Sequence, residues 1–136
     1  MEPEEVMDPR TKAFLAAERR KYGIEPNEYL ALYYAQGGAC YVCRKAKGEA
    51  RRLGTDHDHL TGEVRGLLCT GSLNAMTCNR LIAINTRAAL LRAVEMLSDP
   101  PPARAVLAAM RAGETRIPFL CKEGTFELGD VRGIEN

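Results

Sequence analysis

The sequence predicts an α+β fold in which helices at both ends of the chain flank a zinc-stapled centre that contains a short β-hairpin. Helix start and stop signals gather in residues 9–36 and 80–111. Between them, the runs 53–58 and 63–68 are rich in apolar or β-branched residues, and Thr61-Gly62 separates them, as in a hairpin. Four of the five cysteines lie in two pairs in this same central region.

Helix signals are clearest near the start of the chain. Asp8-Pro9 is typical of an N-cap and first turn, and the segment TKAFLAAERRKY then runs to Gly23, a typical helix stop. Pro26 begins a second segment, PNEYLALYYAQ, which Gly37-Gly38 ends. Residues 1–38 are therefore predicted to form an N-terminal helical arm.

The later elements follow from periodicity and from breaker residues. A helical pattern returns after Cys78 and continues through TRAALLRAVEML until the prolines that follow Asp99. A further helix over Ala103–Arg111 and a tail hairpin, RIPFLCKEGTFEL, complete the prediction. Residues 39–84 thus form the predicted zinc-bound core and residues 85–136 the C-terminal helices and tail hairpin, all within one compact domain.

Composition limits the class of protein. The 136 residues include 46% hydrophobic residues but only three Phe and no Trp, so a small core that needs other support is expected. The apolar runs are short and carry Arg or Glu, which predicts no membrane span. The start MEPEEVMDPR is acidic, unlike a secretory signal, and predicts a cytoplasmic protein in which stable disulfides are rare.

The central cysteines have metal-ligand spacing. Cys40 and Cys43 form a CxxC pair, and Cys69 and Cys78 form a second pair with eight residues between them. Lengthening that loop from two residues costs about 1.2 kcal/mol, against about 10 to 16 kcal/mol supplied by a structural zinc. A four-cysteine zinc site is therefore the simplest prediction, with Cys121 left as a separate core or surface thiol.

Two alternatives remain open at this level. The second cysteine pair can be ordinary buried thiols, with the CxxC pair arising by chance or serving redox chemistry. A site of Cys40, Cys43, His57 and His59 has the two-cysteine, two-histidine count, and alternate residues on a strand share a face. That second set leaves the other cysteine pair unexplained.

Charge is nearly balanced overall but unevenly distributed. Residues 1–8 hold four acids and no base, whereas residues 40–92 hold nine bases and four acids. Such a block suits a phosphate backbone, although a solvated basic face is an equally plain interpretation. The predicted DNA-contacting residues are Arg44, Lys45, Arg51, Arg52, Arg65 and Arg80.

Both histidines of the chain lie in one run, LGTDHDHLTGEVRGLLC, where each follows an aspartate. A lone Asp-His pair is more often structural than catalytic, but here the run lies between two cysteine pairs and within the basic block. Asn79 directly follows Cys78, so a zinc ion would also fix the position of its amide oxygen. An aspartate and an asparagine suit Mg²⁺, whose octahedron waters and phosphate complete.

The segments CYVCRK, LGTDHDHLTGEVRGLLC and CNRLIA strongly resemble the recombination endonuclease VII family of phage-type nucleases, within the His-Me finger or HNH superfamily. The similarity covers roughly residues 19–97. It implies a ββα-metal (His-Me finger) core, with structural zinc on the four central cysteines. It also implies that Asp56 and Asn79 hold catalytic Mg²⁺ or Mn²⁺ and that His57 is the general base.

Some details of that assignment do not follow from spacing. Asp58 and His59 are rival candidates for ligand and base, and His59 can instead contact phosphate or orient the site. Regular strand alternation would place Asp56 and His57 on opposite faces, so their joint role rests on the resemblance. The long loop between Cys69 and Cys78 departs from the tighter spacing of the family.

The resemblance implies a Mg²⁺-dependent DNA endonuclease selective for structure, acting on four-way junctions, other branched DNA or double-stranded DNA. Members of this kind often act as homodimers, and a phage-encoded member would act in the host cytoplasm. The alternative from another class is a non-catalytic four-cysteine zinc module that binds nucleic acid or a protein partner. Only the two candidate Mg²⁺ ligands and the candidate base separate the two hypotheses.

Overall fold

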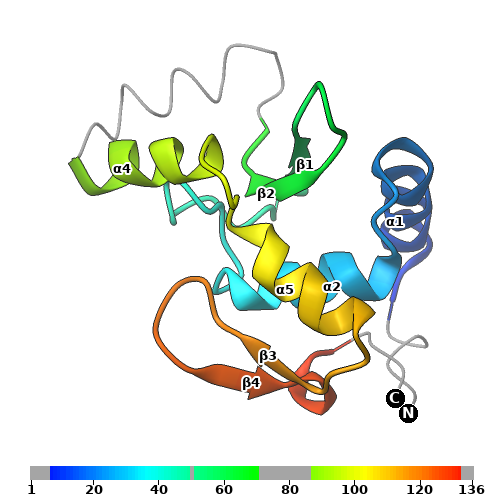
Figure 1. The fold of residues 1–136 in the computed structure, drawn as a ribbon. Helices are drawn as coiled ribbons and strands as arrows, with labels where there is room; N and C mark the ends of the chain where they lie inside the picture. Colours follow the sequence, from blue (N-terminus) through cyan, green and yellow to red (C-terminus); the bar gives the residue numbers. More distant parts are fainter. Residues whose placement is uncertain (1–6, 50, 71–86, 133–136) are drawn as a thin grey trace. The chain divides into compact units, whose positions relative to one another are not determined.

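A computed structural model describes residues 7–49, 51–70 and 87–132, which form a mixed α+β structure (Figure 1). Its helices are α1 (Pro9–Tyr22), α2 (Pro26–Ala35), α4 (Arg87–Met96) and α5 (Ala103–Arg111). Its strands are β1 (Gly54–His57), β2 (Val64–Leu68), β3 (Arg116–Pro118) and β4 (Thr125–Glu127), and the 3-10 helix η2 (Leu128–Asp130) follows them. The predicted α+β class is confirmed. Cys78, Asn79 and Arg80 lie outside the described residues.

The chain divides into two compact units. The first, here called the helical unit, is built from Met1–Gly37 and Ala105–Asn136. The second, called the hairpin unit, is Gly38–Arg104 and contains the DHDH run. No helix in the described ranges is both long enough and apolar enough to span a membrane.

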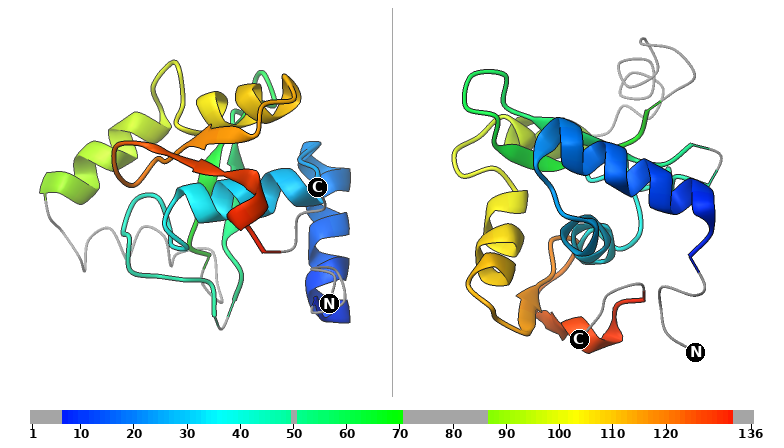
Figure 2. Two further views of the ribbon diagram at one scale, coloured as in Figure 1. Left: turned by 90° about the horizontal axis from the view of Figure 1, so that it is seen from below. Right: turned by 90° about the vertical axis from the view of Figure 1, so that its right-hand side faces the viewer.

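The first two helices begin and end where the sequence predicts. Asp8 caps α1, because its carboxylate accepts the Thr11 N–H at 2.8 Å. Gly23 ends the helix with φ of 71°, a left-handed conformation that costs a glycine little. α2 begins with a capping box in which Glu25 and Glu28 each accept from the other's backbone. In Figure 2, α1 runs across the axis of α2.

The tail hairpin of the helical unit is also confirmed. β3 and β4 pair antiparallel, with Ile117 opposite Phe126, and both of these side chains are buried. The loop between the strands reaches back to α2, since the Leu120 N–H donates to the Ala35 carbonyl at 2.9 Å. Tyr34 of α2 lies against Phe126 with ring centroids 4.9 Å apart, so the sheet packs on this helix.

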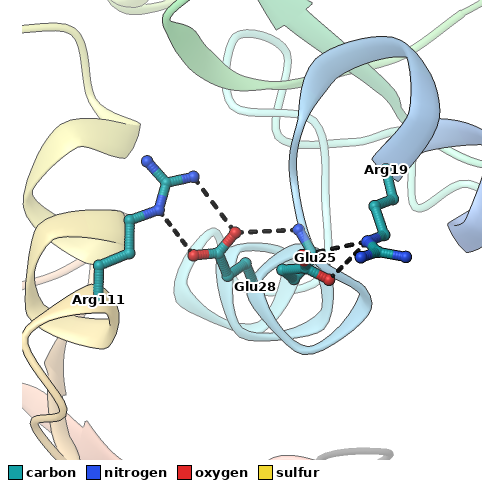
Figure 3. A network of polar contacts seen from close by, with 4 residues as sticks. All are labelled: Arg19, Glu25, Glu28 and Arg111. Carbon is teal, nitrogen blue, oxygen red and sulfur yellow. Dashed lines mark hydrogen bonds and ion pairs between the residues drawn. The ribbon is translucent and has the colours of Figure 1, made fainter.

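A buried carboxylate connects α2 to α5 within the helical unit (Figure 3). The Glu28 side chain is only 8% exposed, and Arg111 donates to its two oxygens at 2.8 and 3.2 Å. This pairing raises the pKa of Arg111. A second pair, Arg19 and Glu25, lies nearby but is exposed on both sides, at 63% and 50%. The two pairs therefore differ mainly in burial.

Replacing Arg111 by Ala is expected to lower the free energy of unfolding by about 1 to 2 kcal/mol, because the buried Glu28 carboxylate loses both charged donors. The half-exposed position of Arg111 keeps this cost below that of a fully buried pair. Replacing Arg19 by Ala is the matched control and should cost less than about 1 kcal/mol. Urea denaturation followed by circular dichroism measures both. Equal losses in the two variants would contradict the role of burial.

Candidate functional site

The site is built on the hairpin of β1 and β2, which contains a β-bulge at the DHDH run. Asp56 pairs with Gly66 and the next residue, His57, pairs with Val64, so Arg65 is one extra residue on β2. A bulge bends the strand that carries the extra residue and increases the local twist. That strand is β2, whereas Asp56 and His57 are consecutive residues of β1, so a joint role for them still rests on the family resemblance.

The two histidines lie beside one another. The ring centroids of His57 and His59 are 4.7 Å apart, and the rings are tilted by 42°. His57 is half-buried and His59 is exposed. β1 ends at His57 and His59 lies in the turn that follows, so the turn rather than strand alternation brings the two rings together.

Arg65 binds the carboxylate of Asp56 through both ends of its guanidinium. Nε lies 2.8 Å from Oδ2, and the second nitrogen lies 3.2 Å from Oδ1. The side chains are 17% and 23% exposed, respectively. The hydrogen bonds to Asp56 raise the pKa of Arg65. The predicted Mg²⁺ ligand is therefore engaged by a residue that the sequence assigned to DNA contact.

Asp58, the rival ligand, has a separate structural use. Its Oδ1 accepts the N–H groups of Leu60 at 2.7 Å and Thr61 at 3.0 Å. These backbone hydrogen bonds lower the pKa of Asp58. Gly62 closes the turn with φ of 79°, a value that favours glycine. The turn alone is a sufficient reason for an aspartate at this position.

Three cysteines gather next to the hairpin. The sulfurs of Cys40, Cys43 and Cys69 all lie within 4.8 Å of one another, and all three residues are buried. Among the described residues, these three cysteines form the group of potential metal ligands whose ligand atoms lie close together. The group contains neither histidine. Cys78, the predicted fourth ligand, falls in the part of the chain that is not described.

Backbone hydrogen bonds hold the CxxC turn in place. The Tyr41 N–H donates to the Leu67 carbonyl at 3.1 Å, which joins the turn to β2. The Ala46 N–H lies 3.4 Å from the Cys43 sulfur, a contact that stabilises a thiolate. Arg44 has φ of 60°, an uncommon left-handed conformation for a residue other than glycine. The backbone of the turn therefore holds the two buried sulfurs close together without help from a metal ion.

A family model described as recombination endonuclease VII matches residues 16–99, more than half of the chain. The chain belongs to the recombination endonuclease VII family. The resemblance to this family that the sequence indicates over roughly residues 19–97 is confirmed.

Two phage proteins are similar to this member of the recombination endonuclease VII family. The Gene 59 protein of Mycobacterium phage D29 is 46% identical over 88 residues, which cover 62% of this chain and 50% of that protein. The Gene 59 protein of Mycobacterium phage L5 is 43% identical over the same coverage. The chain thus spans about half the length of the curated relatives it matches. No solved structure matches the chain significantly.

The donor sets fit the two metals that the resemblance implies to different degrees. Three buried thiols at mutual ligand distance suit a soft, tetrahedral ion such as zinc, and the described residues supply three of its four positions. For Mg²⁺, the described candidate is the Asp56 carboxylate, a hard oxygen donor now paired with Arg65. The second candidate, Asn79, lies outside the description.

The thiols influence one another's ionisation. A hydrogen bond from the Cys69 thiol lowers the pKa of Cys40 to about 5, although burial acts in the opposite direction. The same contact raises the pKa of Cys69. The hydrogen bond between the two sulfurs therefore favours the thiolate form of Cys40, and the thiolate is the form that binds metal.

Zinc is expected to be released on acidification, because protons compete with the ion for the thiolate sulfurs. Dialysis at stepped pH, followed by elemental analysis, measures this loss. Zinc that stays fully bound at about pH 2, far below the range in which thiols ionise, would contradict thiolate ligands.

Long-range contacts that the sequence analysis missed fix the CxxC turn to α4. The Tyr41 hydroxyl donates to the Glu95 carboxylate, and burial followed by this hydrogen bond raises the pKa of Tyr41. Arg92 donates from Nε to the Val42 carbonyl at 2.8 Å. The sequence carries only a weak signal for these contacts. Arg92 and Glu95 lie three residues apart in a helical pattern, which places them on one face of the helix.

The predicted DNA-contacting residues do not all lie in the same environment. Arg44, Lys45 and Arg51 are exposed, and the Arg44 guanidinium lies over the Tyr41 ring, 5.8 Å from its centroid. Arg52 and Arg65 are half-buried. Three of the predicted cationic residues are thus exposed to a large anionic partner.

Proposed function

We propose that this protein is a metal-dependent DNA endonuclease that hydrolyses phosphodiester bonds. The observation that carries the proposal is the bulged hairpin, which presents Asp56 and the adjacent His57 and His59 rings in a chain of this nuclease family. The surrounding bases suit a polyanionic substrate, because phosphate contacts supply most of the affinity for DNA.

The proposed architecture is a ββα-metal core within residues 39–84. Zinc would bind to the four central cysteines, Cys40, Cys43, Cys69 and Cys78, as a structural ion. The catalytic Mg²⁺ or Mn²⁺ would be held by Asp56 and Asn79, with waters and a DNA phosphate completing its coordination. Family membership and the three gathered thiols support this arrangement.

In the proposed reaction His57 acts as general base. Its imidazole accepts a proton from the water that attacks phosphorus. Histidine is well suited to this role at neutral pH. His59, with its ring beside that of His57, contacts the phosphate or orients the base. Bound Mg²⁺ supplies positive charge that stabilises the phosphoryl oxygens and the departing sugar oxygen. The products are a 5′ phosphate and a 3′ hydroxyl.

The proposed substrate is branched DNA, including four-way junctions, with double-stranded DNA as the broader class. Arg44, Lys45, Arg51 and Arg52, together with Arg80, contact phosphates and carry no information about sequence. Two copies of the chain, each with one hairpin site, would allow both strands of a junction to be cut. A phage-encoded protein of this kind would work in the host cytoplasm.

Incubation of zinc-loaded protein with Mg²⁺ and two end-labelled DNAs, a four-way junction and a linear duplex of matched sequence, tests the reaction and substrate together. The junction is expected to be cut faster, and DNA ligase should reseal the nicks without prior phosphorylation. Equal rates would make the protein a general endonuclease. Ends that ligase cannot join would overturn the proposed position of bond cleavage.

One observation favours a second function, a non-catalytic zinc module that binds nucleic acid. The Asp56 carboxylate is fully paired with Arg65, as expected for a hairpin whose charges serve only structure. Such a module would bind the junction but cut neither DNA in Mg²⁺ or Mn²⁺. The same cleavage assay therefore separates the two functions.

A further inference from the structure

The ion pair between Arg65 and Asp56 is placed differently from the other pairs of the hairpin unit. Its two members face each other across β1 and β2, and Arg65 is the extra residue of the bulge. The pair that joins Arg104 to Glu63 has a similar bidentate geometry, at 2.7 and 2.8 Å, but its side chains are 45% and 33% exposed. Arg65 thus forms the less exposed pair, on the carboxylate proposed to bind the catalytic ion.

We infer that Arg65 is a positioning residue that holds the Asp56 carboxylate in the DNA-free protein and exchanges it for a DNA phosphate when the divalent ion binds. The inference rests on the proposed function. It makes the binding of the ion and the binding of DNA cooperative, because each ligand then takes one partner of the existing ion pair.

Arg65 and the divalent ion compete for one carboxylate, that of Asp56. The guanidinium fork engages both oxygens of Asp56, at 2.8 and 3.2 Å. Mg²⁺ and Mn²⁺ need at least one of these oxygens, and a second cation held beside the ion would repel it. With 17% and 23% of the two side chains exposed, solvent screens this repulsion only in part. The free protein should therefore bind the ion weakly.

A DNA phosphate can serve as an alternative partner for Arg65. A phosphodiester presents two oxygens in a geometry that matches the guanidinium fork, as a carboxylate does. Asp58 does not offer an equivalent partner within the hairpin, because its Oδ1 already accepts two backbone N–H groups of the turn. A phosphate bound beside the hairpin can therefore draw Arg65 away and leave the Asp56 oxygens to the ion.

Reciprocity follows from thermodynamic linkage. If DNA raises the affinity for the ion by some factor, the ion must raise the affinity for DNA by the same factor. Removing the guanidinium should abolish both effects together. A merely structural Arg65 would produce neither, because its loss would weaken the fold without strengthening the binding of a cation.

The test is Mn²⁺ binding to the zinc-loaded, DNA-free chain of 136 residues, measured by electron paramagnetic resonance of the free ion. Arg65→Gln is expected to bind Mn²⁺ at least about tenfold more tightly than the native chain. Arg104→Gln is the matched control, since it removes a bidentate arginine that pairs with Glu63 of the same hairpin without touching Asp56. It should leave Mn²⁺ affinity unchanged. Zinc content and circular dichroism verify that each variant is folded.

The reciprocal measurement uses Ca²⁺ and fluorescence anisotropy of a labelled four-way junction. Ca²⁺ should raise the DNA affinity of the native chain about fivefold or more, and that of Arg65→Gln much less. Unchanged or weaker Mn²⁺ binding by folded Arg65→Gln would overturn the inference. If the inference fails in this way but Asp56→Asn in the native chain abolishes Mn²⁺ binding, Asp56 is still a metal ligand and the proposed function survives. If Asp56→Asn has no effect, the proposed metal site fails as well.

Discussion

Replacing Cys40 by Ser is expected to abolish zinc binding and unfold the hairpin unit. The Cys40 sulfur lies within 4.8 Å of the other two described thiols and is buried, so its loss removes one ligand of the set. A structural zinc supplies about 10 to 16 kcal/mol, as much as or more than the roughly 5 to 15 kcal/mol by which a whole domain is stable. The small core of this unit cannot replace that contribution.

Cys121→Ser is the matched control, because Cys121 belongs to the helical unit and not to the thiol group. It should retain about one zinc per chain. Hydrogen exchange followed by mass spectrometry reports the fold locally: amides of β1 and β2 should lose protection in Cys40→Ser and keep it in Cys121→Ser. A zinc-free Cys40→Ser protein with native protection in these strands would contradict a structural metal.

His57→Ala is expected to slow DNA cleavage by about 10²- to 10⁴-fold while DNA binding is retained, because the variant removes only the group that accepts the proton of the attacking water. His59→Ala tests the neighbouring ring, 4.7 Å away, and should cause a smaller loss. Single-turnover cleavage rates, with junction affinity measured in Ca²⁺, separate chemistry from binding. Full activity in His57→Ala together with a large loss in His59→Ala would move the role of base to His59.

Local signals in the sequence were sufficient to predict most described elements. Asp8-Pro9 and Gly23 bound α1 because capping and left-handed conformations are properties of single residues. Thr61-Gly62 identified the turn of the central hairpin for the same reason. The tail hairpin followed from its short strands, Arg116–Pro118 and Thr125–Glu127.

Features that depend on distant residues were not predictable in the same way. A bulge adds one residue to one strand, and the hydrophobic pattern of VRGLL gives no sign that Arg65 is that residue. Its pairing with Asp56 depends on this register. The hydrogen bond between Tyr41 and Glu95 joins residues 54 positions apart, a contact that no local pattern encodes. Asp56 is therefore predictable from the sequence as a candidate ligand, whereas the arginine that holds it is not.

The central claim is that the bulged hairpin forms the catalytic site of a metal-dependent nuclease. Single-turnover cleavage of an end-labelled four-way junction tests it most directly, with zinc-loaded native protein in Mg²⁺, the same protein in EDTA, and His57→Ala in Mg²⁺. The account predicts cutting by the native protein in Mg²⁺ only, with both proteins bound to the junction. Folded native protein that binds the junction but cuts it in neither Mg²⁺ nor Mn²⁺ would contradict the claim, as would undiminished cutting by His57→Ala.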